Sequence, residues 1–202
     1  MRYKPRISDK KAETVRILIE HGADVKTQDE ANTTPLHLAS SMGIPEIVRL
    51  FIERGADVTA QDRMYRTPLH LASSWVSAKP TLLLIKDMTD LNGQDDSDRE
   101  PYRGNSYAKP DIVKLLIDHG ADATAQDETQ STPLHMASSF GCAETVRLLI
   151  ERGADVTARD GNDRTPLHLA SSRVSHETVK LLVQRGLMLM DRTRGPKRIC
   201  IG

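Results

Sequence analysis

Histidine recurs at a regular spacing, and that spacing decides what chemistry it can perform. Seven histidines are present, and four of them close a Thr-Pro-Leu-His tetrapeptide at intervals of 33, 65 and 33 residues: His37, His70, His135 and His168. A metal site or a nucleophile–base pair needs several such groups close together. Because these four take the same place in successive units, we expect one structural histidine in each unit and no metal site.

The other reactive side chains also fail to form a catalytic set. Serine pairs recur with the same period, beginning at Ser40, Ser73, Ser138 and Ser171, so we assign them to the scaffold. The two cysteines, Cys142 and Cys200, form neither a disulfide framework nor a metal-ligand cluster, which fits a reducing compartment. No phosphate-binding glycine loop, nucleophile elbow or zinc-binding helix motif is present. We therefore expect a protein that is not an enzyme, without catalytic residues, cofactor or bound metal.

Composition and charge narrow the class of partner. The 28 basic and 28 acidic residues balance to a net charge of zero, and one Trp, two Phe and four Tyr offer little for base stacking. We expect no nucleic acid partner. The longest purely aliphatic stretch, residues 82–85, is far too short to span a bilayer, and no apolar run follows the basic start of the chain. These features predict an intracellular protein, cytoplasmic or nuclear, that does not bind membranes.

The elements that position these residues can be followed in the segment 34–66. Thr34 suits a helix N-cap, and Pro35 suits the first helical position, where its missing N–H costs nothing. The pattern predicts a short helix to about Met42, ended by Gly43. A second, strongly apolar helix follows, and an extended loop leads to the next Thr-Pro-Leu-His. The unit is therefore helix, turn, helix and loop.

A second motif recurs in step with the first. Gly-Ala-Asp follows the apolar second helices at residues 22–24, 55–57, 120–122 and 153–155. Self-similarity at this period predicts stacked repeats, because one unit alone cannot bury its apolar face. The paired motifs, Thr-Pro-Leu-His-x-Ala and Gly-Ala-Asp, resemble those of the ankyrin-repeat family over about residues 10–190. The resemblance implies an all-α solenoid of helix-turn-helix units with extended loop or β-hairpin tips. It also implies that the motif histidine links its Thr to a neighbouring repeat's backbone.

The 65-residue interval leaves two possible organisations for the middle of the chain. It can hold one repeat with a 32-residue insertion, or two repeats of which one has decayed. Sliding the segment by 33 residues places Leu83 on Leu50 and Pro101 on Pro68 without a gap. We therefore predict a degenerate repeat at 100–131 with an acidic, irregular lead-in and a weak first helix. The predicted divisions are a partial N-terminal repeat or cap at 1–33, repeats at 34–66, 67–99, 100–131 and 132–164, and a C-terminal repeat and cap at 165–202.

The resemblance also implies where a partner binds. In the family, contacts come mainly from the loop tips and the inner face of the first helices, which together form a concave surface. The predicted function is a non-catalytic protein–protein interaction scaffold, monomeric, whose partner is another protein. The predicted partner-binding residues are Met42, Arg63, Met64, Arg66, Ser74, Trp75, Arg99, Glu128, Thr129, Ser139, Phe140, Asn162, Arg164 and Arg173.

Several alternatives stay open at this point. Met42, Trp75, Phe140 and Arg173 share one register, and packing between repeats is the alternative to partner binding for them. The chain can be a targeting fragment of a larger multidomain protein. A remote alternative is an enzyme or nucleic-acid binder that uses the irregular middle or the basic ends. Finally, Tyr65 and Gln130 stand at a tip position that favours a left-handed backbone, which they tolerate poorly, so we expect their two loops to differ in shape.

Overall fold

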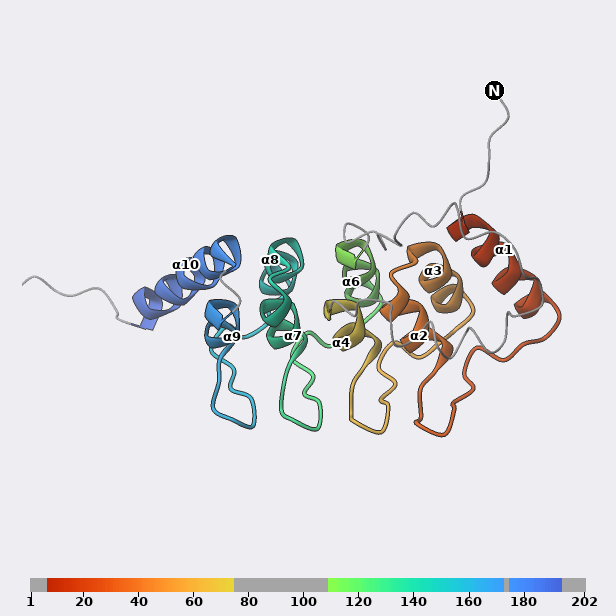
Figure 1. Cartoon of the computed structure of the whole chain (residues 1–202), viewed down its shortest axis with the longest axis horizontal. Helices are drawn as coiled ribbons and strands as arrows, with labels where there is room; N and C mark the ends of the chain where they lie inside the picture. The colour runs from red at the N-terminus through yellow and green to blue at the C-terminus, as the bar shows by residue number, and fades with distance from the viewer. Residues whose placement is uncertain (1–6, 75–108, 173–174, 194–202) are drawn as a thin grey trace, which may run out of the picture. The chain divides into compact units, whose positions relative to one another are not determined.

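Short helices alternate with loops in the computed structural model of the chain, which describes residues 7–74, 109–172 and 175–193 (Figure 1). No β-strand occurs in these ranges, so the fold is all-α and the repeat tips are loops. The chain divides into two units, Met1–Asp122 and Ala123–Gly202, which we describe one at a time. The helices are α1 (Ile7–Glu20), α2 (Pro35–Met42), α3 (Pro45–Glu53), α4 (Pro68–Ser73) and α6 (Lys109–Asp118) in the first unit, and α7 (Pro133–Phe140), α8 (Ala143–Glu151), α9 (Pro166–Ser172) and α10 (His176–Thr193) in the second.

Each repeat pairs a short first helix with a second helix. In the first unit α2 packs against α3 and α4, while α3 packs against α1. In the second unit α7 packs against α8 and α9, and α10 packs against α8 and α9. In both units the loops leave the first helices on the side away from the second helices (Figure 1). The repeats therefore bury apolar residues both within a helix pair and between neighbouring pairs.

The first helices begin and end where their sequences predict. Thr34 is the N-cap of α2, with φ −90° and ψ 162°, and its Oγ1 accepts a hydrogen bond from the His37 N–H at 3.4 Å. Gly43 ends the helix with φ 74°, in the left-handed region that glycine adopts without steric cost. Thr132 and Gly141 cap α7 in the same way. These caps are local, because each involves residues within one or two turns.

Leucine and small residues form the core between the stacked helices. Leu36, Leu69 and Leu134, from the repeated motif, are fully buried. The second helices contribute Val48 and Leu149, which are also fully buried. Burying a side chain of this size contributes roughly 1.5–3 kcal/mol, so the repeated positions supply much of the favourable free energy of folding.

The motif histidine links its helix to the loop that precedes the next helix. The Thr34 N–H donates to His37 Nδ1 at 3.2 Å, and His37 Nε2 lies 3.0 Å from the Arg66 carbonyl oxygen. A carbonyl oxygen only accepts, so Nε2 carries the hydrogen and donates it. In the second unit His135 makes the same bond to the Arg164 carbonyl oxygen, also at 3.0 Å. This geometry matches the linking role that the resemblance implies.

The packing of α6 bears on the organisation of the middle of the chain. In the first unit α6 packs against both α4 and α3, as α10 packs against α9 and α8. In a linear stack a second helix packs against the first helix of its own repeat and reaches only the immediately adjacent repeats. We therefore infer that α4 and α6 form one repeat, interrupted by residues 75–108. The arrangement favours the insertion over the decayed repeat predicted at 100–131, whose predicted first helix lies outside the described residues.

The two end repeats differ from the others in helix length. Among the described residues no first helix precedes α1, and the partial repeat at 1–33 stays a prediction. At the other end α10 continues through Gly186 to Thr193, beyond the position at which Gly55 and Gly153 follow the equivalent helices. The predicted cap therefore includes a continuation of the last helix.

We predict that removing a buried serine hydroxyl from a first helix stabilises the protein. The hydroxyls of Ser40 and Ser138 are buried and have no hydrogen-bond partner. Alanine avoids this desolvation cost and is the better helix former, so Ser40→Ala or Ser138→Ala should each raise the free energy of unfolding by about 1 kcal/mol. Urea denaturation followed by circular dichroism measures the change. Ser171→Ala is the control, because that exposed hydroxyl already donates to the Leu167 carbonyl oxygen at 2.8 Å. Equal effects at buried and exposed sites would contradict the explanation.

We also predict a loss of stability in mildly acidic solution. Burial lowers the pKa of His37 and His135 below the ordinary value of 6.5, and the backbone hydrogen bonds to Arg66 and Arg164 offset this only in part. The unfolded chain therefore takes up protons that the folded chain does not, and stability present above about pH 6.5 is lost as the pH falls further. In urea titrations between pH 7.5 and 5, a His37→Gln, His135→Gln variant should start less stable but show a shallower fall. A slope as steep as that of the unmodified protein would count against this cause.

Candidate partner-binding surface

An aspartate carboxylate closes the loop tip at residues 62–66. Asp62 Oδ1 accepts the Met64 and Arg66 backbone N–H groups at 2.9 and 3.0 Å. Its Oδ2 accepts Arg66 Nε at 2.8 Å and lies 2.7 Å from Arg66 Nη2. The Asp62 N–H donates in turn to the Arg66 carbonyl oxygen at 3.0 Å. Bonds between Asp62 and Arg66 thus fix the backbone of the loop, and the side chains of residues 63–65 face solvent.

The same closure recurs in the other described tips. Asp160 accepts the Asn162 and Arg164 N–H groups, both at 2.9 Å, and Arg164 Nε at 2.9 Å. Asp127 accepts the Thr129 and Ser131 N–H groups at 2.8 and 2.9 Å. Asp29 accepts the N–H groups of Ala31 and Thr33, both at 2.8 Å. We call this arrangement the aspartate clasp, formed by Asp29, Asp62, Asp127 and Asp160.

The carboxylates of Asp62 and Asp160 are held in the ionised form. Burial raises the pKa of Asp62, but the hydrogen bonds from Arg66 and from the backbone of Met64 outweigh it, so the pKa lies below the ordinary 3.8. The pKa of Asp160 is lowered by the same balance, with Arg164 as the main donor. An ionised carboxylate forms stronger hydrogen bonds than a neutral one. The loops therefore keep their shape across the neutral range of pH.

All four described tips adopt one backbone conformation. In each tip the residue three positions after the clasp aspartate has positive φ: Asn32 at 57°, Tyr65 at 58°, Gln130 at 58° and Asp163 at 60°. The expectation that the loops of Tyr65 and Gln130 differ in shape is wrong. The clasp bonds on both sides of these residues impose the left-handed conformation, against the intrinsic preference of a bulky side chain.

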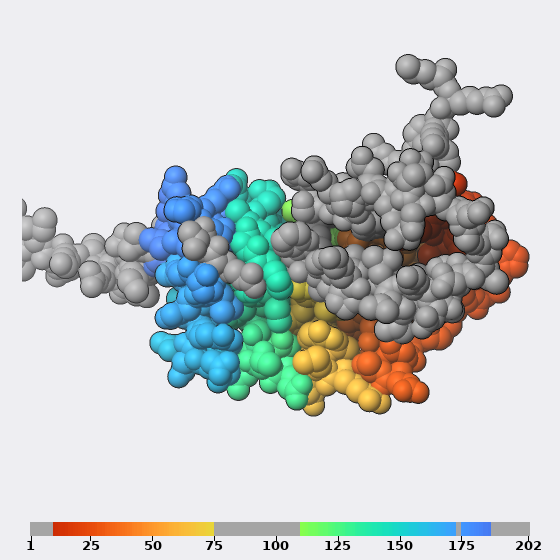
Figure 2. Space-filling model, in the orientation of Figure 1, coloured from red at the N-terminus to blue at the C-terminus, as the bar shows by residue number. Residues whose placement is uncertain are grey.

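Backbone hydrogen bonds join adjacent tips into rows within each unit. The Arg63 N–H donates to the Ala31 carbonyl oxygen at 2.9 Å in the first unit. In the second unit the Gly161 N–H donates to the Thr129 carbonyl oxygen at 2.8 Å. A Cβ at position 161 would lie 3.1 Å from that oxygen, so glycine allows the close approach. In Figure 2 the orange and yellow loops of the first unit stand side by side, and so do the green and blue loops of the second unit.

Only part of the predicted partner-binding set lies on this exposed edge. The exposed members are Arg63, Met64, Glu128, Thr129, Asn162 and Arg164. Met42, Ser139 and Phe140 are half-buried at the ends of first helices, which leaves both partner binding and packing between repeats as explanations. Trp75, Arg99 and Arg173 lie outside the described residues.

Some predicted residues have structural bonds that compete with partner binding. The Thr129 hydroxyl donates to Asp127 Oδ1 at 2.7 Å. The guanidinium groups of Arg66 and Arg164 close the clasps through Asp62 and Asp160, with Nη2–Oδ2 distances of 2.7 and 2.8 Å. Ser74 is buried, and its hydroxyl donates to the Leu71 carbonyl oxygen at 3.0 Å. The sequence places these residues near the tips and helix ends, but it does not show that their polar groups bond to other groups of the protein.

Tyr65 belongs to the surface but was absent from the predicted set. Its side chain is 57% exposed, next to Met64 at 45%. The sequence did contain a signal, because an aromatic residue stands where glycine or asparagine adopts the backbone more easily. Such a residue is a candidate for function, since it persists at a conformational cost.

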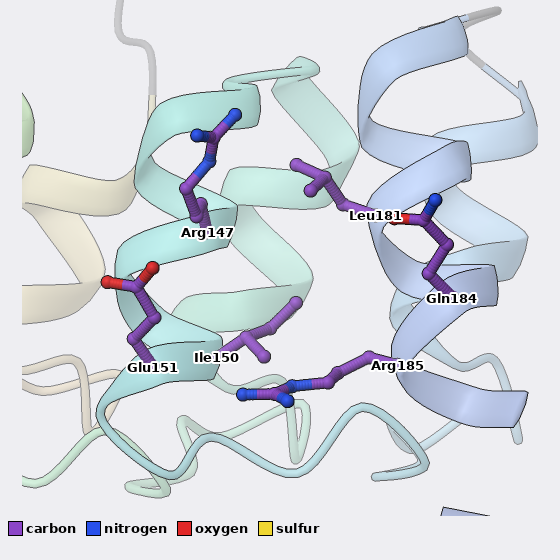
Figure 3. Close-up of a pocket in the computed structure, with 6 residues that line it drawn as sticks. All are labelled: Arg147, Ile150, Glu151, Leu181, Gln184 and Arg185. Atoms are coloured by element: carbon purple, nitrogen blue, oxygen red, sulfur yellow. The ribbon is translucent and has the colours of Figure 1, made fainter. Parts of the chain in front are cut away.

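A shallow pocket lies between α8 and α10, away from the tips (Figure 3). Its volume is about 260 Å³, and Ile150 and Leu181 point into the gap between the helices. Arg147, on its rim, pairs with Glu177 at 3.5 Å and with Glu144 at 3.9 Å. These residues hold no nucleophile beside a base, so we do not take the pocket as a catalytic site.

The described residues show neither a metal-ion site nor a helix that could span a membrane. No group of three or more His, Cys, Asp or Glu side chains among them is placed to hold a metal ion. No helix in that part of the chain is both long enough and apolar enough to cross a membrane.

We predict that a clasp aspartate contributes more to the stability of the fold than a loop aspartate outside the clasp. Asp62→Ala leaves the Met64 and Arg66 N–H groups and the Arg66 side chain without their acceptor, and should lower the free energy of unfolding by about 2 kcal/mol. Asp57→Ala is the matched control, because Asp57 is exposed and accepts from Thr59, at 2.8 Å from its N–H and 2.7 Å from its hydroxyl, but binds no arginine side chain in the described structure. Thermal and urea unfolding measure both variants. Similar losses in the two would show that the clasp has no special role.

Comparison with known proteins agrees with this geometry. A family model for ankyrin repeats, spanning three copies, matches residues 7–95 and 105–192, which is most of the chain. The chain is also similar to human protein phosphatase 1 regulatory subunit 27, with 51% identity over 35 residues, which are 17% of this chain and 23% of that protein. The mouse protein of the same name is 49% identical over 35 residues, with the same shares. The chain thus spans under a quarter of the length of these relatives. The repeated motifs, the helix pairs they form and the family match show that the chain belongs to the ankyrin-repeat family.

Proposed function

We propose that the chain is a non-catalytic protein-binding module whose partner contacts the loop tips and the exposed ends of the first helices. Membership of the ankyrin-repeat family supports a protein-interaction role. The loop tips support this location of the binding site, because they repeat one backbone conformation but expose different side chains. A rigid frame lowers the entropy that a loop loses when it binds. We further propose an intracellular monomer.

The observation that carries the proposal is the tip formed by Arg63, Met64 and Tyr65. All three side chains are exposed, and Met64 and Tyr65 are two of the most exposed large apolar side chains in the described part of the chain. Arginine, methionine and tyrosine are enriched in protein interfaces, and arginine and tyrosine at their energetic hot spots. Tyr65 also sits at φ 58°, which costs a bulky residue about 1–2 kcal/mol. A side chain exposed at that cost is better explained by binding than by folding.

The phosphatase regulatory subunits do not extend this proposal to a phosphatase. Their match covers 35 residues, close to the length of one repeat, and so reflects the shared repeat. A targeting fragment of a larger multidomain protein would use the same surface, and the same experiment applies to it. The predicted residues Trp75, Arg99 and Arg173 stay part of the proposal without support from the described structure.

We predict that changing this tip weakens partner binding without destabilising the fold. In a Met64→Ser, Tyr65→Gly variant the clasp is intact, and glycine adopts positive φ more easily, so thermal stability should be equal or higher. Affinity capture from cell lysate, with quantitative mass spectrometry, should recover the main partner at least ~10-fold less with this variant, as expected for loss of a hot spot.

The control for this capture is an Arg49→Ser, Glu53→Ser variant, which changes two exposed residues of α3 on the second-helix side. It should capture the partner as well as the unmodified chain does. Equal capture by the tip variant and the unmodified chain would exclude the tip of residues 62–66 as the contact. Loss of capture in the control alone would place the interface on the second helices.

A further inference from the structure

Leu18 of α1 is exposed, although its equivalent is buried in every other second helix of the described structure. The neighbouring Ile17 is also exposed, whereas its equivalents are buried or half-buried. Aligning the helices on the glycine that follows or ends them places Leu18 of α1 level with Phe51, Leu116, Leu149 and Leu182. Leu18 is 56% exposed, whereas these four are 8%, 0%, 0% and 3% exposed. Ile17 is 46% exposed, whereas Leu50, its equivalent in α3, is 9% exposed. We call Ile17 and Leu18 the open face of α1.

A first helix covers this face in the other repeats. α3 packs against α2, α6 against α4, α8 against α7, and α10 against α9. α1 packs against α3, but the described residues contain no first helix for it. The open face therefore has the position and composition of a helix–helix contact whose other half is not among the described residues.

The segment directly before this contact does not fold back to supply it. In the complete repeats a glycine with left-handed φ separates the two helices, as Gly43 does at 74° and Gly141 at 70°. The equivalent position in the first repeat is Lys10, which lies inside α1. Because α1 is continuous from Ile7, the chain runs straight through the place where the others turn.

We propose that the open face of α1 binds a short helix of a partner protein, with the chemistry of the first helix of an ankyrin repeat. The other repeats show what fits: α2 buries Leu36, Ala39 and Ser40, so a leucine followed by small residues three and four positions later allows close approach. A second copy of this chain is a poor source, because α2, α4, α7 and α9 already cover second helices of their own. This surface is separate from the loop tips and goes beyond the proposed function.

The experiment uses the full chain and a synthetic peptide with the sequence of residues 33–44, which contains the first helix α2 and its Thr-Pro start. Methyl-labelled protein is titrated with the peptide, and the Ile17 and Leu18 methyl resonances are followed by NMR. We expect saturable shifts of these resonances, with a dissociation constant of about 1 mM or tighter, since a short peptide must order as it binds. A scrambled peptide of the same composition should cause no saturable shift.

Two variants of α1 sharpen the result. Leu18→Gln should weaken peptide binding at least ~10-fold while leaving thermal stability unchanged, because the side chain is exposed in the free protein. Glu20→Gln, a change at another exposed position of the same helix, should leave binding unchanged. The Met64→Ser, Tyr65→Gly tip variant should also bind the peptide normally, so failure of this inference is distinguishable from failure of the proposed function.

Three outcomes would overturn the inference. The first is the absence of saturable shifts at Ile17 and Leu18, or equal affinity in the Leu18→Gln variant. The second is protection of the Leu18 methyl groups from a soluble paramagnetic reagent in the free protein, which would show that another part of this chain covers the face. The third is self-association, detected by sedimentation and abolished by Leu18→Gln, which would make a second copy the occupant.

Discussion

One carbonyl oxygen joins the buried start of a first helix to the exposed tip of a loop. The Arg66 oxygen accepts His37 Nε2 and the Asp62 N–H, both at 3.0 Å. Two lone pairs allow both bonds at once. Arg164 does the same for His135 and Asp160, at 3.0 and 2.9 Å. Because the histidines are buried, breaking either bond would leave a polar group in a medium of low dielectric constant, so helix and tip hold a fixed relation.

This coupling explains how different side chains can be displayed on one backbone. The residues that build the frame are the capping threonine, the motif histidine and the clasp aspartate, and all three are turned toward the protein. Apart from Thr129, whose hydroxyl donates to Asp127 Oδ1 at 2.7 Å, the residues between the clasp positions take no part in these bonds through their side chains. Their identity can therefore change from Ala31 and Asn32 in one tip to Met64 and Tyr65 in the next, while the φ values stay within a few degrees. Such an arrangement suits recognition, because the loop loses little conformational freedom on binding.

Stacking imposes a second constraint, which concerns the ends of each run of repeats. A repeat buries its apolar face only where a helix of its own or of an adjacent repeat covers it. In the first unit α3 and α6 each pack against a first helix and against another second helix. Among the described residues α1 packs against the second helix α3 but against no first helix. The exposed Leu18 and the buried Leu116 thus have the same place in the repeat and opposite environments, and the difference comes entirely from their neighbours.

The sequence by itself determined the features that depend on nearby residues. Thr34 and Pro35 at a helix start and Gly43 at its end act within one or two turns, so the first helices could be located from their motifs, as could the structural role of the histidines.

The sequence could not divide the 65-residue interval, because a decayed repeat and an insertion fit the same spacing. Only the packing of α6 against α3 and α4 favours the insertion. Local preference also misled for Tyr65, whose backbone is set by the clasp, and for Arg66 and Ser74, whose polar groups turn inward. The division of the interval depends on contacts between residues far apart in the sequence, which leave no mark on local spacing. The clasp and Ser74 bonds join residues three or four positions apart, but only the folded loop shows which of their polar groups meet.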